Sequence, residues 1–138
     1  MAGTTMKLFT ILFALLLSSC AAYDAVVMTR FDANEYQMIT KIRVDSSHFK
    51  NSCDDPTASR ANATTLAQET ELFAAYSEHL PHNGDGYRAA QELDAMAQGL
   101  GKQYQTSSTV STLFCKLKFE GVEHSANTIQ HVLGKRPR

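Results

Sequence analysis

The sequence lacks the short motifs that identify most known enzymes and metal proteins. Its 138 residues include no H-E-x-x-H pair, no C-x-x-C spacing, no G-x-S-x-G turn around a serine and no glycine-rich phosphate loop. An excess of charge is missing as well, because 13 basic residues stand against 14 acidic ones and the net charge is −1. That balance gives no electrostatic reason to expect nucleic acid as a partner. We therefore expect no catalytic residue, no metal site and no small-molecule cofactor.

Histidines and acids are the side chains left to form a site, and their spacing does not favour one. Glu78, His79 and His82 lie near one turn, but a proline separates the two histidines and would break a helix between them. His124 and His131 are two helical turns apart without further ligands around them. We expect these histidines at surface or capping positions. The acids expected on solvated helix faces are Glu69, Glu71, Glu78, Glu92 and Asp94.

The N-terminal segment differs in composition from the rest of the chain and is typical of an export signal. Lys7 supplies a positive charge, and residues 8 to 17 form a run that is apolar except for Thr10. A permanent membrane-spanning helix needs about 20 apolar residues, so this run is too short to be one. The run ends in Leu17-Ser18-Ser19-Cys20, which is a leucine and two small residues before a cysteine.

These four residues resemble the lipobox of bacterial lipoproteins. The resemblance implies that residues 1 to 19 are a signal peptide that is removed. It also implies that Cys20 receives a diacylglyceryl group on its thiol and an acyl chain, such as palmitate, on its new amino group. Each buried methylene contributes about 0.8 kcal/mol, so two or three chains bind a membrane almost permanently. Ala21, in place of an aspartate, points to the outer membrane, facing the periplasm. The alternatives are an ordinary secretory signal with an incidental Cys20, or a short buried helix in a cytosolic protein.

Cys53 and Cys115 are the two cysteines left in the mature chain, and we expect them to form a disulfide. An exported domain folds in an oxidising compartment, where such bonds persist. Closing a loop of this length would contribute roughly 4 kcal/mol to stability on the chain-entropy model. The alternatives, a catalytic thiol or a metal pair, lack a C-x-x-C spacing and a partner motif.

Residues 20 to 31 are expected to be the lipidated cysteine and its tether, and residues 32 to 138 the helical domain. The domain opens with a predicted helix over residues 33 to 51. Asp32 and Glu35 match a capping box, and Phe31 and Tyr36 match the flanking hydrophobic staple. Alternating apolar residues between 36 and 44 leave a strand open as the alternative. The expected apolar stripe of the helix is Met38, Ile39, Ile42 and Phe49.

A second and a third helix are predicted on either side of a turn. A polar connection runs through residue 63, and Thr65 with Gln68 suggests the cap of a helix that ends near Leu80. Residues 81 to 86 have turn composition rather than the oxygen series of a calcium loop. The third helix has the strongest period in the chain. Its stripe is Ala90, Leu93, Ala97, Leu100 and Tyr104, and that of the second helix is Leu66, Phe73, Tyr76 and Leu80.

A fourth helix is predicted at the end of the chain. Ser107 or Ser108 would cap it, Gly121 would kink or split it, and Gly134 would end it. The apolar residues assigned to its buried face are Val110, Phe114, Leu117, Ile129 and Val132.

Four amphipathic helices with mostly short links predict an all-α fold, a small four-helix bundle with up-down-up-down topology. In that topology the end of the first helix meets the start of the fourth. Cys53 lies just past the first helix and Cys115 lies in the opening turns of the fourth, so the predicted disulfide and the predicted bundle agree.

These features together favour a membrane-anchored lipoprotein that acts as a noncatalytic protein-binding or adaptor module, with another envelope protein as its partner. The layout is similar to that of the type II secretion pilotins, which are small helical lipoproteins with a bridge between distant cysteines and a secretin segment as ligand. That likeness rests on helix order and on Cys53 and Cys115 alone. The alternative is a phage- or plasmid-type exclusion lipoprotein, or an inhibitor of a cell-wall hydrolase.

Overall fold

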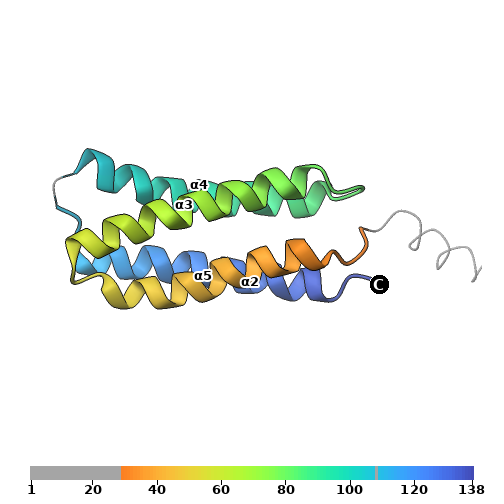
Figure 1. Cartoon of the computed structure of the whole chain (residues 1–138), viewed down its shortest axis with the longest axis horizontal. Coiled ribbons are helices and arrows are strands. Elements are labelled where there is room, and N and C mark those ends of the chain that lie inside the picture. Colours follow the sequence, from red (N-terminus) through yellow and green to blue (C-terminus); the bar gives the residue numbers. More distant parts are fainter. Residues whose placement is uncertain (1–28, 108) are drawn as a thin grey trace, which may run out of the picture.

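Four long antiparallel helices make up the part of the chain that the structure describes, which is residues 29 to 107 and 109 to 138 of a computed structural model (Figure 1). Successive helices are joined at alternating ends of the bundle, so the predicted all-α class and up-down-up-down topology are confirmed. The predicted lipidation site, Cys20, lies outside the described residues. The helices are α2 (Ala33–Phe49), α3 (Pro56–Glu78), α4 (Gly84–Thr106) and α5 (Thr112–Gly134), with a 3-10 turn η1 (Lys50–Ser52) after α2.

The start of α2 follows from its capping residues. The Asp32 side chain accepts a hydrogen bond from the Glu35 backbone N–H at 2.8 Å, and the rings of Phe31 and Tyr36 lie 5.5 Å apart. The predicted cap and staple are therefore confirmed, and the strand alternative for residues 36 to 44 is wrong. The second half of the capping box does not form, because the Glu35 side chain turns into the bundle, where the residue is only 1% exposed.

The start of α3 corrects the prediction of a polar connection through residue 63 and a cap at Thr65. Asp55 is the cap, since its side chain accepts hydrogen bonds from the backbone N–H groups of Thr57 (2.8 Å) and Ala58 (3.0 Å). Pro56 then takes the first helical position, where its missing N–H costs nothing. The hydrophobic pattern does not reveal the first turns of α3, because the side chains buried there, Ser59 and Ala63, are small.

The boundaries of α4 and α5 also differ from the predicted ones. α4 begins at Gly84, inside the segment predicted as a turn. α5 begins at Thr112, because the Ser111 hydroxyl accepts the capping hydrogen bond from the Phe114 N–H at 3.2 Å. This corrects the predicted cap at Ser107, and the alternative, Ser108, lies outside the described residues. The helix then continues through Gly121 without the expected kink or split, up to Gly134 as predicted.

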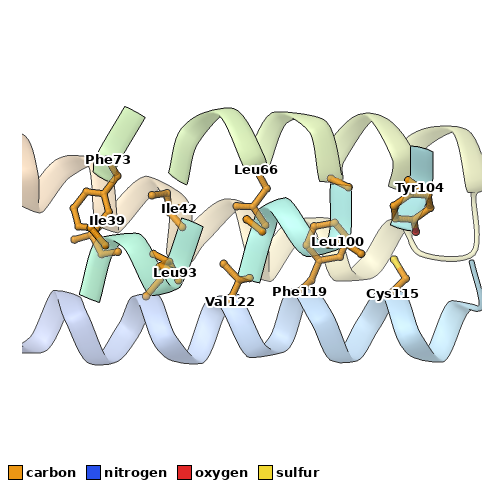
Figure 2. Close-up of a cluster of buried hydrophobic side chains, with 14 of the residues drawn as sticks. Ile39, Ile42, Leu66, Phe73, Leu93, Leu100, Tyr104, Cys115, Phe119 and Val122 are labelled. Atoms are coloured by element: carbon orange, nitrogen blue, oxygen red, sulfur yellow. The ribbon is translucent and has the colours of Figure 1, made fainter. Parts of the chain in front are cut away.

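The core runs the length of the bundle between the pairs α2–α5 and α3–α4 (Figure 2). The predicted stripe of α4 is buried throughout, from Ala90 to Tyr104. The predicted stripe of α5 is wrong in part, because Leu117 and Val132 are 58% and 59% exposed. The side of the helix that carries Cys115 faces the core. The residues that α5 buries are Cys115, Phe119, Val122, Ala126 and Leu133.

Candidate functional site

The predicted disulfide joins Cys53 and Cys115 at one end of the bundle. The two Sγ atoms are 1.99 Å apart and the Cα atoms 5.7 Å apart, a separation that a disulfide normally spans. Both residues are buried, and Figure 2 shows Cys115 beside Tyr104 at this end of the core. We call it the disulfide end, and it comprises η1, the first turns of α3 and α5 and the last turn of α4. The bond fastens the chain after α2 to the start of α5, as predicted.

The opposite end, called here the terminal end, holds both the first and the last described segments of the chain (Figure 1). The backbone N–H of Phe31 donates a hydrogen bond to the carbonyl oxygen of Pro137 at 2.8 Å. The Thr29 hydroxyl donates to the carbonyl oxygen of His82 at 2.5 Å, and the Arg138 guanidinium lies 5.5 Å from the centre of the Phe31 ring. Both chain segments are thus attached to the α3–α4 turn and to each other.

A buried polar cluster lies beneath these contacts and consists of Glu35, Ser77, Asn83 and Arg136. Oε1 of Glu35 accepts hydrogen bonds from the Ser77 hydroxyl at 3.0 Å and from the Asn83 amide at 2.8 Å. Oε2 accepts one from the Arg136 guanidinium at 2.5 Å. A second guanidinium nitrogen donates to Oδ1 of Asn83 at 2.7 Å. The polar cluster satisfies its own charges and hydrogen bonds, and it ties α2, α3, the α3–α4 turn and the C-terminal tail together.

Sequence reasoning missed the polar cluster because each member has an ordinary local explanation. Glu35 matched a capping box, Asn83 a turn, and Arg136 a solvated basic tail. One signal was available: Glu35 lies four residues before Ile39 and seven before Ile42, which places a carboxylate on the buried face of α2. A carboxylate on such a face requires a cationic or multiply donating partner.

Gly86 makes room for the polar cluster. A Cβ atom at this position would lie 2.1 Å from Oδ1 of Asn83 and 2.6 Å from a guanidinium nitrogen of Arg136, closer than real contacts allow. At Gly84, two residues earlier, a Cβ atom would meet nothing within 4 Å. The segment predicted as a turn thus contains a glycine with a specific packing role.

The histidines that were considered as metal ligands lie at the surface of the bundle. His79, His82, His124 and His131 are all exposed, and no group of three metal-binding side chains occurs within residues 29 to 107 and 109 to 138. His79 follows the last turn of α3, and His82 has a positive φ of 57°. These positions match the expected surface and capping roles.

Two of the acids that were expected to be solvated are partly buried instead. Burial raises the pKa of Glu69, even though Lys41 donates a hydrogen bond to this carboxylate and also to Asp45. Asp94 accepts hydrogen bonds from the Thr70 hydroxyl at 2.9 Å and from the Gln98 amide at 3.2 Å. These acids link neighbouring helices. The remaining acids of the set, Glu71, Glu78 and Glu92, are exposed as expected.

An open hollow of about 390 Å³ lies between α2 and α5. The amine of Lys50 donates a hydrogen bond to Glu123 at its edge, over 2.7 Å, which lowers the pKa of Glu123 and raises that of Lys50. The hollow has a polar wall, unlike the mostly apolar wall of small-molecule sites. Its lining residues are Arg43, Glu120, Glu123, His124 and Asn127.

Comparison with protein-family models, with curated proteins and with solved structures finds no match for this chain. Within its described residues, no helix is both long and apolar enough to cross a membrane.

Proposed function

We propose that the chain is a lipid-anchored protein of the bacterial envelope whose helical domain serves as a noncatalytic protein-binding or adaptor module outside the cytoplasm. The observation that carries the proposal is the Cys53–Cys115 disulfide. Structural disulfides form and persist in oxidising compartments, and they are rare in the cytosol of most organisms. The bond therefore supports the export signal and lipobox that the sequence of the first 20 residues resembles.

The position of the chain ends supports an anchored arrangement. Thr29 lies at the terminal end, nine residues after Cys20 in the sequence. Nine residues span at most about 30 Å when fully extended. Lipid on Cys20 would therefore keep the terminal end within that distance of the membrane. The helices α3, α4 and α5 have 23 residues each, so they would carry the disulfide end about 35 Å further along the bundle axis.

The adaptor role requires a rigid surface and an anchor, and the bundle offers the first of these. The disulfide holds one end of it, and the polar cluster ties four chain segments together at the other. A pre-organised surface of this kind loses little conformational entropy when a partner binds. An inhibitory or exclusion lipoprotein would use the same arrangement, and the identity of the bound partner separates it from an adaptor.

Mass spectrometry of the mature N-terminus tests the anchor. For the wild-type protein we expect a peptide that starts at Cys20 and carries a diacylglyceryl group and an acyl chain. Cys20→Ser should remain unacylated and leave the membrane fraction, whereas Ser19→Ala, which keeps a small residue in the box, should be processed normally. An unmodified N-terminus upstream of residue 20 in the wild type would contradict the anchor.

Crosslinking in intact cells, followed by affinity capture, tests the adaptor role. We expect one envelope protein to be recovered with the wild type and to be lost or strongly reduced with Cys20→Ser. Recovery of no protein from either form would refute the adaptor role and leave the result for the anchor unaffected.

A further inference from the structure

Two exposed leucines lie together on α5 at the disulfide end. Leu113 and Leu117 are four residues apart, so they lie one above the other on the same face of the helix. They are 68% and 58% exposed, and they face away from the core side that carries Cys115. We call this pair the leucine ridge. Apolar side chains in adjacent turns form a small anchor surface of the kind that accepts an amphipathic helix.

Lysines border the leucine ridge on both sides. Lys116 and Lys118 flank Leu117 in the sequence, and each is displaced from it by about 100° around the helix. Both are exposed, and neither forms an ion pair with another described residue. The amine of Lys118 lies 5.3 Å from the centre of the Phe114 ring, so its side chain stays close to the ridge. Glu120 is exposed on the same side of α5, one turn beyond Leu117. The ridge therefore combines apolar contact area with a lysine on each border and a single acid beyond its C-terminal end.

We propose that the leucine ridge is the docking surface for the protein partner and that the partner presents an acidic amphipathic helix. Two apolar side chains of that helix would cover Leu113 and Leu117, and carboxylates beside them would face Lys116 and Lys118. Charge complementarity of this kind orients a partner and excludes basic competitors. The proposal rests on the adaptor role and assigns that role to a specific surface.

Two other occupants fit the leucine ridge less well. The protein's own membrane would lie near the terminal end, whereas the ridge lies in the first turns of α5, at the far end of a helix about 35 Å long. A second copy would pair through a two-fold contact, in which the same surfaces meet. Lys116 and Lys118 of both copies would then approach one another, and like charges oppose such a contact.

A photoreactive phenylalanine analogue, placed by itself at position 113 or at position 72, tests the proposal in intact cells. Leu72 on α3 is the matched control, because it is 60% exposed and forms no part of the ridge. We expect the crosslink to form at position 113 and to be about tenfold weaker at position 72, and we expect the crosslinked partner peptide to be acidic with helical periodicity. A crosslink to lipid, to a second copy or to a segment without acids would overturn the proposal, and so would equal yields at both positions.

Charge and apolar variants provide a second measurement. Leu117→Glu, and separately the pair Lys116→Glu with Lys118→Glu, should each lower the recovery of the crosslinked partner by about tenfold. Leu72→Glu should leave the recovery of the crosslinked partner unchanged. Thermal melting should show that every variant is folded. If the partner is still captured at wild-type yield by the ridge variants, the ridge is the wrong surface and the adaptor role stands. If no variant and no wild-type sample captures a partner, the adaptor role fails, and the ridge proposal fails with it.

Discussion

Glu35 shows how one charged side chain can link three parts of a small bundle. It is 1% exposed, and its two oxygens accept hydrogen bonds from Ser77, Asn83 and Arg136. A carboxylate at such a position is stable only when it is paired and hydrogen-bonded, because its transfer out of water is costly. The polar cluster meets both conditions, so the termini of the described chain depend on it.

Replacing Glu35 by glutamine should therefore destabilise the protein. Glu35→Gln leaves the Arg136 guanidinium, whose side chain is only 10% exposed, without its counter-charge. We expect a loss of about 3 kcal/mol in the free energy of unfolding, measured by urea titration. Asp85→Asn breaks an exposed surface pair with Arg88 and should leave the free energy of unfolding nearly unchanged. Equal losses for the two variants would show that the polar cluster is not a stabilising element.

Gly86 and Gly84 allow a matched test of the space around the polar cluster. Gly86→Ala places a Cβ atom into contact with Asn83 and Arg136, so we expect a loss of about 1 to 3 kcal/mol in the free energy of unfolding. Gly84→Ala meets no neighbour and should be neutral or stabilising by up to about 1 kcal/mol, because alanine favours the helix. Urea titration of both variants decides the matter, and a Gly86→Ala protein as stable as Gly84→Ala would contradict the packing role.

The helices of this chain were predictable to different degrees, and the difference lies in side-chain size. The buried stripe of α4 has the large residues Leu93, Leu100 and Tyr104 at helical spacing, with alanines between them, so its buried face follows from the sequence. The first turns of α3 bury serine and alanine instead, and a hydrophobic pattern does not register these residues. Asp55-Pro56 is the local signal that marks the true start of α3, because aspartate caps a helix and proline suits its first position.

The ion pair of Lys50 and Glu123 fastens η1 to α5 and should make stability depend on pH. The hydrogen bond from Lys50 lowers the pKa of Glu123 below its ordinary value of 4.5. A carboxyl group whose pKa is lowered on folding stabilises the folded state at pH values above its ordinary pKa. This contribution is lost as the pH falls through the pKa of the folded state. We expect the stability difference between the wild type and Glu123→Gln to be present above pH 4.5 and to shrink as the pH falls further below 4.5.

Urea titrations across this pH range measure that difference. Glu92→Gln, which removes an exposed acid of α4, is the control and should show no such dependence. A difference between wild type and Glu123→Gln that stays constant with pH, or grows as the pH falls, would rule out the ion pair as its source.

The two ends of the bundle differ in how far the sequence alone reveals them. Cysteine number and helix order were enough to predict the Cys53–Cys115 disulfide at one end. The polar cluster at the other end joins Glu35 to Arg136, residues 101 positions apart, and no local pattern pairs them. Their pairing depends on α2 and α5 lying side by side, with the C-terminal tail folded back over the end. Only the three-dimensional arrangement supplies that information.

Removal of the disulfide should lower the stability of the whole bundle. Its loop spans 62 residues, for which the chain-entropy model gives about 4 kcal/mol. We expect Cys53→Ala with Cys115→Ala to lose about that amount in urea titration, and the wild type to lose a similar amount after reduction with dithiothreitol. A double variant as stable as the oxidised wild type would show that helix packing alone holds this end. Free thiols at 53 and 115 in protein purified from its host cells would count against export as well.

The backbone hydrogen bond between Phe31 and Pro137 brings the two ends of the described chain within reach of a short linker. Such a linker would allow a circular permutant in which Arg138 is joined to Thr29 and the chain is opened between α4 and α5 instead. The closeness of the two ends also determines where a fluorescent tag should be placed. A tag fused after Arg138 would sit at the terminal end, on the side of the proposed anchor, and leave the disulfide end uncovered. A tag inserted between α4 and α5 would cover the disulfide end.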